Sequence, residues 1–485
     1  NPPYIQLQKM GKETDILQEA GFETFARTGD IYCLFYEKGF DLLKRGGTLT
    51  YITSNKWMRG GYGKSLRNYF TKVNTQKILN LGPGIFHSAT VDTNIYVGKK
   101  EAFDNQVKGI SIENRFDISF LKDDELIPMR DVNEDAWVVL DEADLKISRS
   151  FEKHGKPLKD WEIKINFGIK TGFNEAFIID QAKRDELVAE DPKADEIIRP
   201  ILKGREIERY YAEWSKDFII STFPAKNLDI DDLPSIKNYL ESFQPKLNQT
   251  GEEFINENGE VEKTRKRTVN KWFETQDPIA FQEEFKKEKV IWKRIGSIMR
   301  FAYSDEEMYC LDSTCIATGE KIKYLTAVLN SKAGLYQLFK TSPQTGTGDQ
   351  IISVQALEPL LVHYPSDEVE AKFNLMVDYI LFIKKSKDAL FQSVTNENVS
   401  GIFENLVDMM VYELYFEEEM KAKEIDVLQF VTEKAFPDIT QAEDKKAIIQ
   451  KVYYELQQKD NPIRNRILVA SSRSETIARI NAATS

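Results

Sequence analysis

The fold of the N-terminal region is decided by residues 29–58, GDIYCLFYEKGFDLLKRGGTLTYITSNKWM. Asp30 is a residue type that caps helices, and Gly46 or Gly47 follows where a helix would end. The helix between them is expected to turn one apolar face inward, consisting of Ile31, Leu34, Phe35 and Leu42. The apolar run TLTYIT (48–53) then predicts a short buried strand.

This alternation continues outward along the chain. A helical pattern covers about 63–72, and strand patterns follow at 77–81 and 93–99. Helices alternating with strands in this way predict an α/β sheet with crossover helices. We therefore expect an α/β domain over residues 1–140.

Two further changes in residue pattern divide the rest of the chain. From 141 to 365, short β-branched and aromatic runs are broken by Gly, Pro and Asn, which predicts an α+β domain. From 366 to 485 the pattern is helical, beginning with Ser366 as an N-cap. The inward face of that first helix is expected to contain Phe373, Met376, Val377, Ile380 and Ile383. A second face is expected to contain Phe403, Leu406, Val407, Met410, Val411 and Leu414.

Bulk composition narrows the class of protein. With 485 residues, of which 41% are hydrophobic, the chain is long enough for two or three folded domains. The sequence shows no apolar run of membrane-spanning length and no leader, so a cytoplasmic protein without a membrane partner is the default expectation. Three cysteines and three histidines, widely scattered, predict no metal site. The net charge of −12 does not exclude nucleic acid, because the run KTRKRTVNK (263–271) is locally basic.

The tetrapeptide Asn1-Pro2-Pro3-Tyr4 carries the most specific chemistry. The Asn1 side-chain oxygen and the Pro2 carbonyl can each accept one hydrogen of an exocyclic amine, which localises the nitrogen lone pair toward an incoming methyl group. The prolines stiffen the segment. Tyr4 offers a flat face for an extruded base. The alternative interpretation is a proline turn that ends a strand, with an aromatic residue packed behind it.

On these residues the chain resembles the γ-class, TaqI-type N6-adenine DNA methyltransferases, especially those of type IIG restriction–modification enzymes. In that family NPPY ends the fourth strand, so the resemblance implies the C-terminal half of a Rossmann-like methyltransferase sheet. The stretch LGPGIFHSATVDTNIYVGKK (81–100) resembles a later motif whose phenylalanine helps to hold the flipped adenine. This base-pocket role would fall on Phe86, for which the alternative is a core aromatic residue.

The family's cofactor motifs are not matched. Its glycine-rich loop for S-adenosylmethionine, and the acidic residue for the ribose, precede NPPY. This sequence begins at NPPY, and Gly60-Gly61-Tyr62-Gly63 lacks the G-x-G-x-x-G spacing. The resemblance implies S-adenosylmethionine as the cofactor of a longer parent, held by a missing N-terminal part of the same polypeptide. We therefore expect the chain not to methylate by itself.

Residues 141–365 resemble the family's target-recognition domain, through phrases such as GIKTGFNEAFIID (168–180) and WKRIGSIMRFAY (292–303). The implied partner is double-stranded DNA. A glycine-flanked loop and later basic positions supply the candidate DNA contacts, which are Lys170, Thr171, Asn174, Lys203, Arg205, Lys293, Arg294 and Arg300. The basic run adds Arg265, Lys266 and Arg267, whose alternative is a solvated loop. For Asn55, Lys56 and Trp57, a DNA or cofactor contact and a polar strand-end loop are equally expected.

Three hypotheses follow. The first is a site-specific adenine-N6 methyltransferase portion of a restriction–modification or related phage-defence enzyme. The second is a DNA-binding specificity module without chemistry of its own. The third is nuclease activity at Pro437-Asp438 and Glu443-Asp444-Lys445, which is disfavoured because the spacing is too short to place the acids on two strands.

Overall fold

The computed structural model describes residues 1–82, 85, 92–112, 121–129, 132–134, 137–345 and 349–484. The chain forms two compact units. Unit 1 contains Asn1–Gly155 and Tyr336–Ile352, and unit 2 contains Lys156–Leu335 and Ser353–Ser485. The functional division at residues 140 and 365 stays a prediction. Within the described ranges, no helix combines the length and the apolar composition needed to cross a bilayer.

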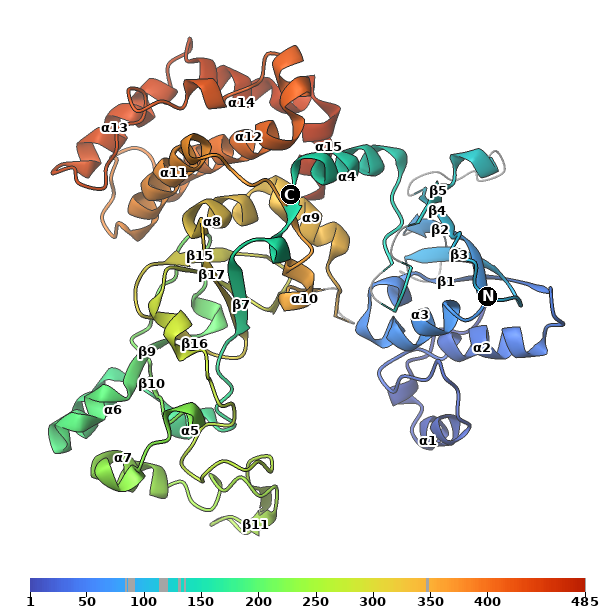
Figure 1. The fold of residues 1–485 in the computed structure, drawn as a ribbon, viewed down its shortest axis with the longest axis horizontal. Coiled ribbons are helices and arrows are strands. Elements are labelled where there is room, and N and C mark those ends of the chain that lie inside the picture. The colour runs from blue at the N-terminus through green and yellow to red at the C-terminus, as the bar shows by residue number, and fades with distance from the viewer. Residues whose placement is uncertain are drawn as a thin grey trace. The chain divides into compact units, whose positions relative to one another are not determined.

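Unit 1 is built on a mixed sheet, which among the described residues has the strand order β1-β3-β2-β4-β5. Its strands are β1 (Thr48–Ser54), β2 (Asn74–Gly82), β3 (Thr93–Lys99), β4 (Lys108–Ser111) and β5 (Ile127–Pro128); β18 (Gln350–Ile351) also belongs to the unit. Its helices are α1 (Lys12–Glu19), α2 (Tyr32–Leu42), α3 (Lys64–Phe70) and α4 (Glu142–His154) (Figure 1). Because β3 runs antiparallel to both β1 and β2, these two strands point the same way, and α3 connects them. The strands predicted at 48–53, 77–81 and 93–99 are confirmed, as is the helix at 63–72.

The predicted inner face of the first helix was right for Leu34, which is buried, but wrong for Phe35 and Leu42. Phe35 is 39% exposed and Leu42 is 77% exposed, whereas the buried side of α2 carries Tyr32, Tyr36 and Phe40. These three aromatic residues, spaced at i, i+4 and i+8, bury more apolar surface than the aliphatic face and therefore set the rotation of the helix.

Unit 2 contains two four-stranded sheets, β15-β13-β17-β7 and β16-β9-β10-β8, among its described residues. The strands are β6 (Lys156–Pro157), β7 (Ile163–Phe167), β8 (Ile178–Ile179), β9 (Ile198–Leu202), β10 (Phe218–Ile220), β11 (Glu253–Ile255), β12 (Val261–Lys263), β13 (Lys289–Lys293), β14 (Ile295–Gly296), β15 (Phe301–Ser304), β16 (Tyr309–Cys310), β17 (Thr314–Gly319) and β19 (Leu361–Val362). The helices before residue 360 are α5 (Asn174–Phe177), α6 (Gln181–Glu190), α7 (Pro234–Glu241), α8 (Ile322–Asn330), α9 (Lys332–Thr341), which extends across the unit boundary, and α10 (Val354–Leu357).

The C-terminal part of unit 2 is helical, as predicted. It contains α11 (Asp367–Lys385), α12 (Asn396–Ala422), α13 (Lys445–Leu456), α14 (Pro462–Arg473) and α15 (Glu475–Ala483). Ser366 caps α11 by accepting a hydrogen bond from the Val369 amide, and all the predicted core residues of α11 and α12 are buried. Helix α8 packs against β13 and β15 and also against α11, so it joins the sheet to the helices (Figure 1).

Buried charges also tie the sheet region of unit 2 to α12. The Arg209 guanidinium lies 3.1 Å from a Glu404 carboxylate oxygen, and Lys384 lies 3.0 Å from the other oxygen. One turn later, Asp408 accepts a hydrogen bond of 2.8 Å from the Lys332 amide. Burial raises the pKa of Asp408 to about 6.

Asp408→Asn is expected to remove part of the pH dependence of stability. The unfolded aspartate titrates near pH ~3.9, so between about pH 4 and about pH 6 the folded chain holds a proton that the unfolded chain has released. In this window Asp408 lowers the free energy of unfolding as the pH rises, by roughly 2 to 3 kcal/mol in total. Asparagine keeps the acceptor for Lys332 but has no charge. Urea titrations at several pH values in this window measure the free energy of unfolding. If its slope against pH were the same in the variant as in the unaltered chain, the prediction would be contradicted.

Candidate functional site

The N-terminal tetrapeptide is anchored to unit 1 by the segment that follows it. The Ile5 amide donates to the Asp30 carboxylate at 2.9 Å, and the Ile31 amide donates to the Ile5 carbonyl at 2.9 Å. Asp30 was predicted as a helix cap, but Ile31 occupies the cap position of α2 and, among the described residues, no side chain caps the helix. The Asp30 carboxylate instead fixes the N-terminal segment. The adjoining Tyr4 ring consequently packs against the core, edge-to-face with Tyr32 at a centroid distance of 5.9 Å.

Within the tetrapeptide, the two groups expected to bind an amine differ in exposure, because Pro2 is buried. Asn1 is exposed, and its side-chain oxygen accepts a hydrogen bond of 3.2 Å from the Tyr4 hydroxyl. Among the described residues, no donor reaches the Pro2 carbonyl. Burial, together with the charge of Asp30, raises the pKa of Tyr4, so the phenol is neutral at physiological pH and remains a donor. Tyr4 thereby orients the Asn1 oxygen, which has a second lone pair for another donor.

Polar side chains gather where β1 and β2 end. Both strands end opposite Thr93, so their carboxyl ends lie at the same end of the sheet. The fully buried Asn94 accepts hydrogen bonds there from Trp57 Nε1 at 3.2 Å and from the Thr53 hydroxyl at 3.1 Å. Beside it, Asn55 donates to Asn80 at 2.9 Å. The carboxyl ends of strands are where ligands bind in open α/β sheets, and this end is correspondingly polar.

Other predicted positions of unit 1 have different environments. Trp57 is completely buried against Phe70 and Trp137, so it belongs to the core, not to a DNA or cofactor contact. The Lys56 side chain is exposed. Phe86 lies outside the described residues.

Gly60 and Gly63 are closely packed. A Cβ on Gly63 would lie 2.0 Å from the Trp57 carbonyl oxygen, and a Cβ on Gly60 would lie 2.8 Å from the Lys56 carbonyl oxygen. These glycines are therefore required for close packing of the turn that precedes α3.

In unit 2, one end of the sheet β15-β13-β17-β7 gathers basic loops. Strands β7 and β13 finish at this end and β17 begins there, as the pairings Phe167–Cys315 and Trp292–Cys315 show. The 3-10 turn Gly204–Glu206 packs against it, because a Cβ on Gly204 would lie 3.3 Å from the Lys293 side chain. Four predicted DNA contacts meet here, which we call the basic loop cluster: Lys170, Arg205, Lys293 and Arg294.

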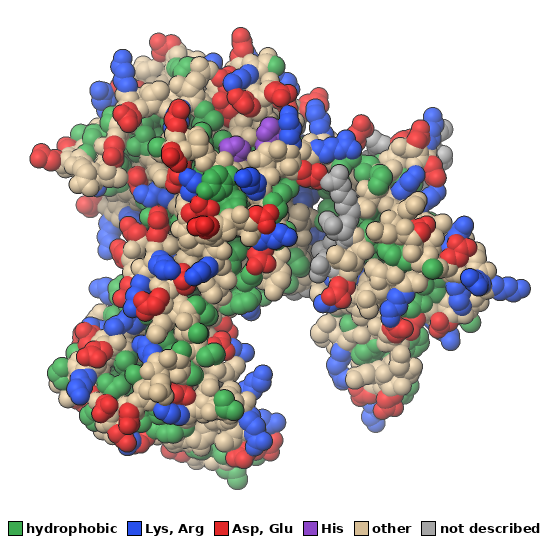
Figure 2. Space-filling model, in the orientation of Figure 1, with side chains coloured by type: hydrophobic (Ala, Val, Ile, Leu, Met, Phe, Trp, Pro, Cys, Tyr) green, Lys and Arg blue, Asp and Glu red, His purple; other side chains and the backbone are tan. Residues whose placement is uncertain are grey.

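Within the cluster and its surroundings, charge is mixed. The Asp277 carboxyl group lies near Lys170. Burial raises the pKa of Asp277, and the positive charge of Lys170 acts in the opposite direction. Lys203 forms an ion pair with Asp217, and Arg300 pairs with Glu208 at 2.7 Å. On the face drawn in Figure 2, acidic and basic side chains are likewise intermixed. Lys203 and Arg300 are thus already neutralised, whereas Lys170, Arg205 and Lys293 are exposed.

Two predicted contacts are internal instead. Thr171 is 1% exposed, and its hydroxyl donates to Asn174 at 2.6 Å, which closes the turn before α5. Arg265 is 4% exposed and donates to four main-chain carbonyls, those of Thr171, Leu247, Trp272 and Glu274. Both side chains hold loops together and have no free donor for a phosphate. The neighbours Lys266 and Arg267 are exposed, although Arg267 also donates to the Thr250 carbonyl at 3.2 Å.

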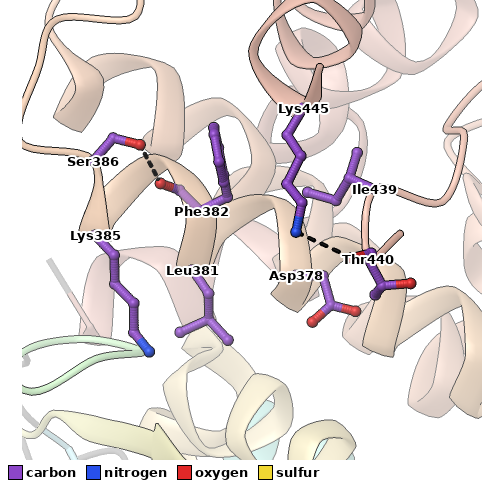
Figure 3. A pocket seen from close by; sticks show the side chains of 8 residues that line it. All are labelled: Asp378, Leu381, Phe382, Lys385, Ser386, Ile439, Thr440 and Lys445. Atoms are coloured by element: carbon purple, nitrogen blue, oxygen red, sulfur yellow. Dashed lines mark hydrogen bonds between the residues drawn. The ribbon is translucent and has the colours of Figure 1, made fainter. Parts of the chain in front are cut away.

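The C-terminal helices contain a cavity of about 320 Å³ between α11 and the segment that leads into α13 (Figure 3). Asp378 is the one acidic residue in its lining, and its carboxylate is paired with Lys323 at 2.7 Å. The acids of the suggested nuclease pattern serve local structure: Asp438 accepts from the Thr440 amide, and Asp444 caps α13. Among the described residues, no cluster of three or more potential metal ligands is present. These contacts give no support to the nuclease hypothesis.

The sequence did not single out Phe167 or Asn94. Phe167 is a strand residue that remains 39% exposed beside Arg294, and an aromatic residue at a strand end next to a basic pair is the signal that could have identified it. The role of Asn94 depends on hydrogen bonds from residues about 40 positions away, so no local pattern reveals it.

Comparisons with known proteins match both regions. Residues 1–86 match the family model described as the Eco57I restriction-modification methylase, and residues 199–359 match the TaqI-like C-terminal specificity domain. Residues 1–86 are therefore similar to a restriction–modification methylase, and residues 199–359 are similar to a TaqI-like specificity domain.

Individual relatives are distant. The chain is similar to the type II methyltransferase M.BstVI of Geobacillus stearothermophilus, with 23% identity over 58% of this chain and 51% of that protein. It is also similar to M.PaeR7I of Pseudomonas aeruginosa, with 21% identity over 50% of this chain and 44% of that protein. The chain thus spans about half the length of these relatives. A solved structure of the type IIL restriction–modification enzyme MmeI in complex with DNA covers 99% of this chain and 57% of its own, with a TM-score of 0.42 and 11% identity.

Proposed function

We propose that these residues form the amine-binding and DNA-reading portion of a site-specific DNA adenine-N6 methyltransferase of a restriction–modification system, of the type IIG kind. The observation that carries this proposal is the position of Asn1-Pro2-Pro3-Tyr4 inside the methylase match, in a chain that also carries a specificity segment. The exposed Asn1 side chain and the Pro2 carbonyl, which no described donor reaches, supply the acceptor chemistry.

The proposed chemistry assigns a separate task to each residue. The Asn1 oxygen and the Pro2 carbonyl accept the two N6 hydrogens of a flipped adenine, which directs the nitrogen lone pair out of the base plane. Tyr4 stacks on the base and, through its hydroxyl, holds the Asn1 oxygen. Phe86 is proposed to contact the other side of the base. S-adenosylmethionine would supply an electrophilic methyl group, and we propose that residues outside this sequence bind it.

Double-stranded DNA is the proposed partner of unit 2. We assign phosphate contacts to Lys170, Arg205 and Lys293 of the basic loop cluster, with Lys266 and Lys56 as further exposed cations. Lys203 and Arg300 could join them only by leaving their acidic partners. Asn174 stays a candidate because it is exposed at the start of α5.

Selection from a random duplex library with the 485-residue chain tests the proposal. We expect one sequence to be enriched, and enrichment of none would overturn the DNA-reading assignment. Calorimetry with S-adenosylmethionine alone tests the proposal that residues outside this sequence bind the cofactor. No measurable affinity is expected, and binding would show that the cofactor site lies within these residues. If the longer polypeptide binds its site but never methylates it, the chain is a specificity module without chemistry.

Lys293→Ala is expected to weaken DNA binding to all sequences about equally. A lysine on a phosphate releases about one counterion, so the slope of log K against log salt should fall by about one. Binding titrations at several salt concentrations measure this slope. Glu190→Ala, on α6 outside the cluster, is the control and should leave the slope unchanged; an unchanged slope for Lys293→Ala would remove it from the phosphate contacts.

A further inference from the structure

Most arginines between residues 156 and 335, in the region proposed to read DNA, already contact acceptors within the protein. Residues 156–335 contain eight arginines. Six of them contact carboxylates or main-chain carbonyls: Arg184, Arg199, Arg209, Arg265, Arg267 and Arg300. Within the described part of the chain, the guanidinium groups of the other two, Arg205 and Arg294, have neither a hydrogen-bonded acceptor nor an ion-pair partner. A charged group without an internal partner is available for an external one.

Both available arginines lie in the basic loop cluster. The Arg294 amide donates to the Ser313 carbonyl at 2.9 Å, and a Cβ on Gly204, next to Arg205, would lie 3.2 Å from the Ser313 hydroxyl. The two arginines therefore flank the same short segment at the end of the sheet. Lys293, which precedes Arg294 in the sequence, lies against Gly204, because a Cβ there would lie 3.3 Å from its side chain.

Arg294 differs from Arg205 in having an aromatic platform. Its guanidinium carbon lies 5.8 Å from the centroid of the Phe167 ring, and Phe167 is 39% exposed at the end of β7. Since β7 and β13 both pair with β17, two regular strands position the ring and the arginine. A ring beside a guanidinium restrains the side chain without using its N–H groups. The planar donor fork is then kept for a ligand.

We infer that Arg294 reads a guanine in the recognised sequence, and that Phe167 positions it. The inference rests on the proposed DNA-reading function. Two parallel N–H donors match the O6 and N7 acceptors that guanine presents in the major groove, and the other bases do not offer this pair. Arg205, which has no such platform, is left as a phosphate contact. Arg294 therefore determines specificity, while Lys293 and Arg205 contribute affinity.

Library selection with variants of the full chain tests the inference. Arg294→Ala and Arg294→Lys are expected to lose the preference for guanine at one position, by roughly 5- to 150-fold, because lysine keeps the charge but not the planar fork. Phe167→Leu should weaken that same preference, and Phe167→Tyr should retain it. The matched control is Arg184→Ala, since Arg184 also lies over a ring, that of Phe218, but is neutralised by Asp195. Its selection profile should equal that of the unaltered chain.

The outcomes are distinguishable. A preference that is lost at one guanine, with the other positions unchanged, supports the assignment. A uniform loss of affinity in Arg294→Ala, equal to that of Lys293→Ala, would make Arg294 a phosphate contact and overturn it, as would an unchanged profile. If Phe167→Leu matches Phe167→Tyr, the positioning role is wrong. Failure of the unaltered chain to enrich any sequence would instead overturn the proposed function itself. Thermal unfolding of each variant shows whether a loss of binding is a loss of folding.

Discussion

Asn1→Ala is expected to lower adenine methylation by about 10²- to 10³-fold in the longer polypeptide that we propose carries this sequence. Removing one fixed hydrogen-bonding group from a site that stabilises a reacting atom lowers the rate by about this factor. Alanine removes the oxygen that Tyr4 now orients and leaves only the Pro2 carbonyl to accept from the amine. Incorporation of labelled methyl groups into the recognised duplex, under single-turnover conditions, measures the loss.

Variants of Tyr4 separate stacking from orientation. Tyr4→Ala removes the ring and should approach the loss of Asn1→Ala, whereas Tyr4→Phe removes only the 3.2 Å hydrogen bond and should cost much less. Leu42→Ala is a suitable control, because this side chain is 77% exposed on α2. Methylation that persists in both Asn1→Ala and Tyr4→Ala would refute the assignment of the tetrapeptide.

Local pattern was sufficient for several elements of secondary structure. The strand runs at 48–53 and 93–99 and the Ser366 cap were predictable, since each depends on a few consecutive residues. The rotation of α2 was not, because the choice between its aliphatic and aromatic faces depends on the shape of the core against which it packs. The order of strands, with antiparallel β3 between β1 and β2, likewise involves pairings that the sequence does not encode locally.

The same distinction applies to the candidate sites. Charge runs identify where arginines are, but not which of them face solvent. Arg265 was predicted from the most basic stretch of the chain and is buried among carbonyls, whereas Arg294, outside that stretch, has no internal acceptor among the described residues. Whether an arginine is structural or ligand-binding depends on acceptors that are distant in sequence: Arg265 reaches the Thr171 carbonyl, 94 residues away.

Arg265→Ala is expected to lower the free energy of unfolding of unit 2 by about 3 to 5 kcal/mol. The guanidinium is 4% exposed, and its hydrogen bonds connect the loops at Thr171, Leu247 and Glu274. Its removal leaves several carbonyls without a donor and opens a cavity, and both effects are costly in a buried site. Burial lowers the pKa of Arg265 to about 10, so the side chain is still charged at neutral pH and its bonds to the carbonyls are charge-assisted. Urea titration at neutral pH measures the change.

The adjacent residue supplies the control that decides between a structural and a DNA-contacting arginine. Lys266→Ala removes an exposed cation of the same run and should alter stability by less than about 0.5 kcal/mol. Arg265→Met fills part of the volume but lacks the donors. Its free energy of unfolding should lie above that of Arg265→Ala and well below that of the unaltered chain. If Arg265→Ala unfolds at the same urea concentration as the unaltered chain and yet binds every duplex more weakly, Arg265 contacts phosphate after all. The two roles therefore predict opposite results in the same pair of measurements, stability and salt-dependent binding.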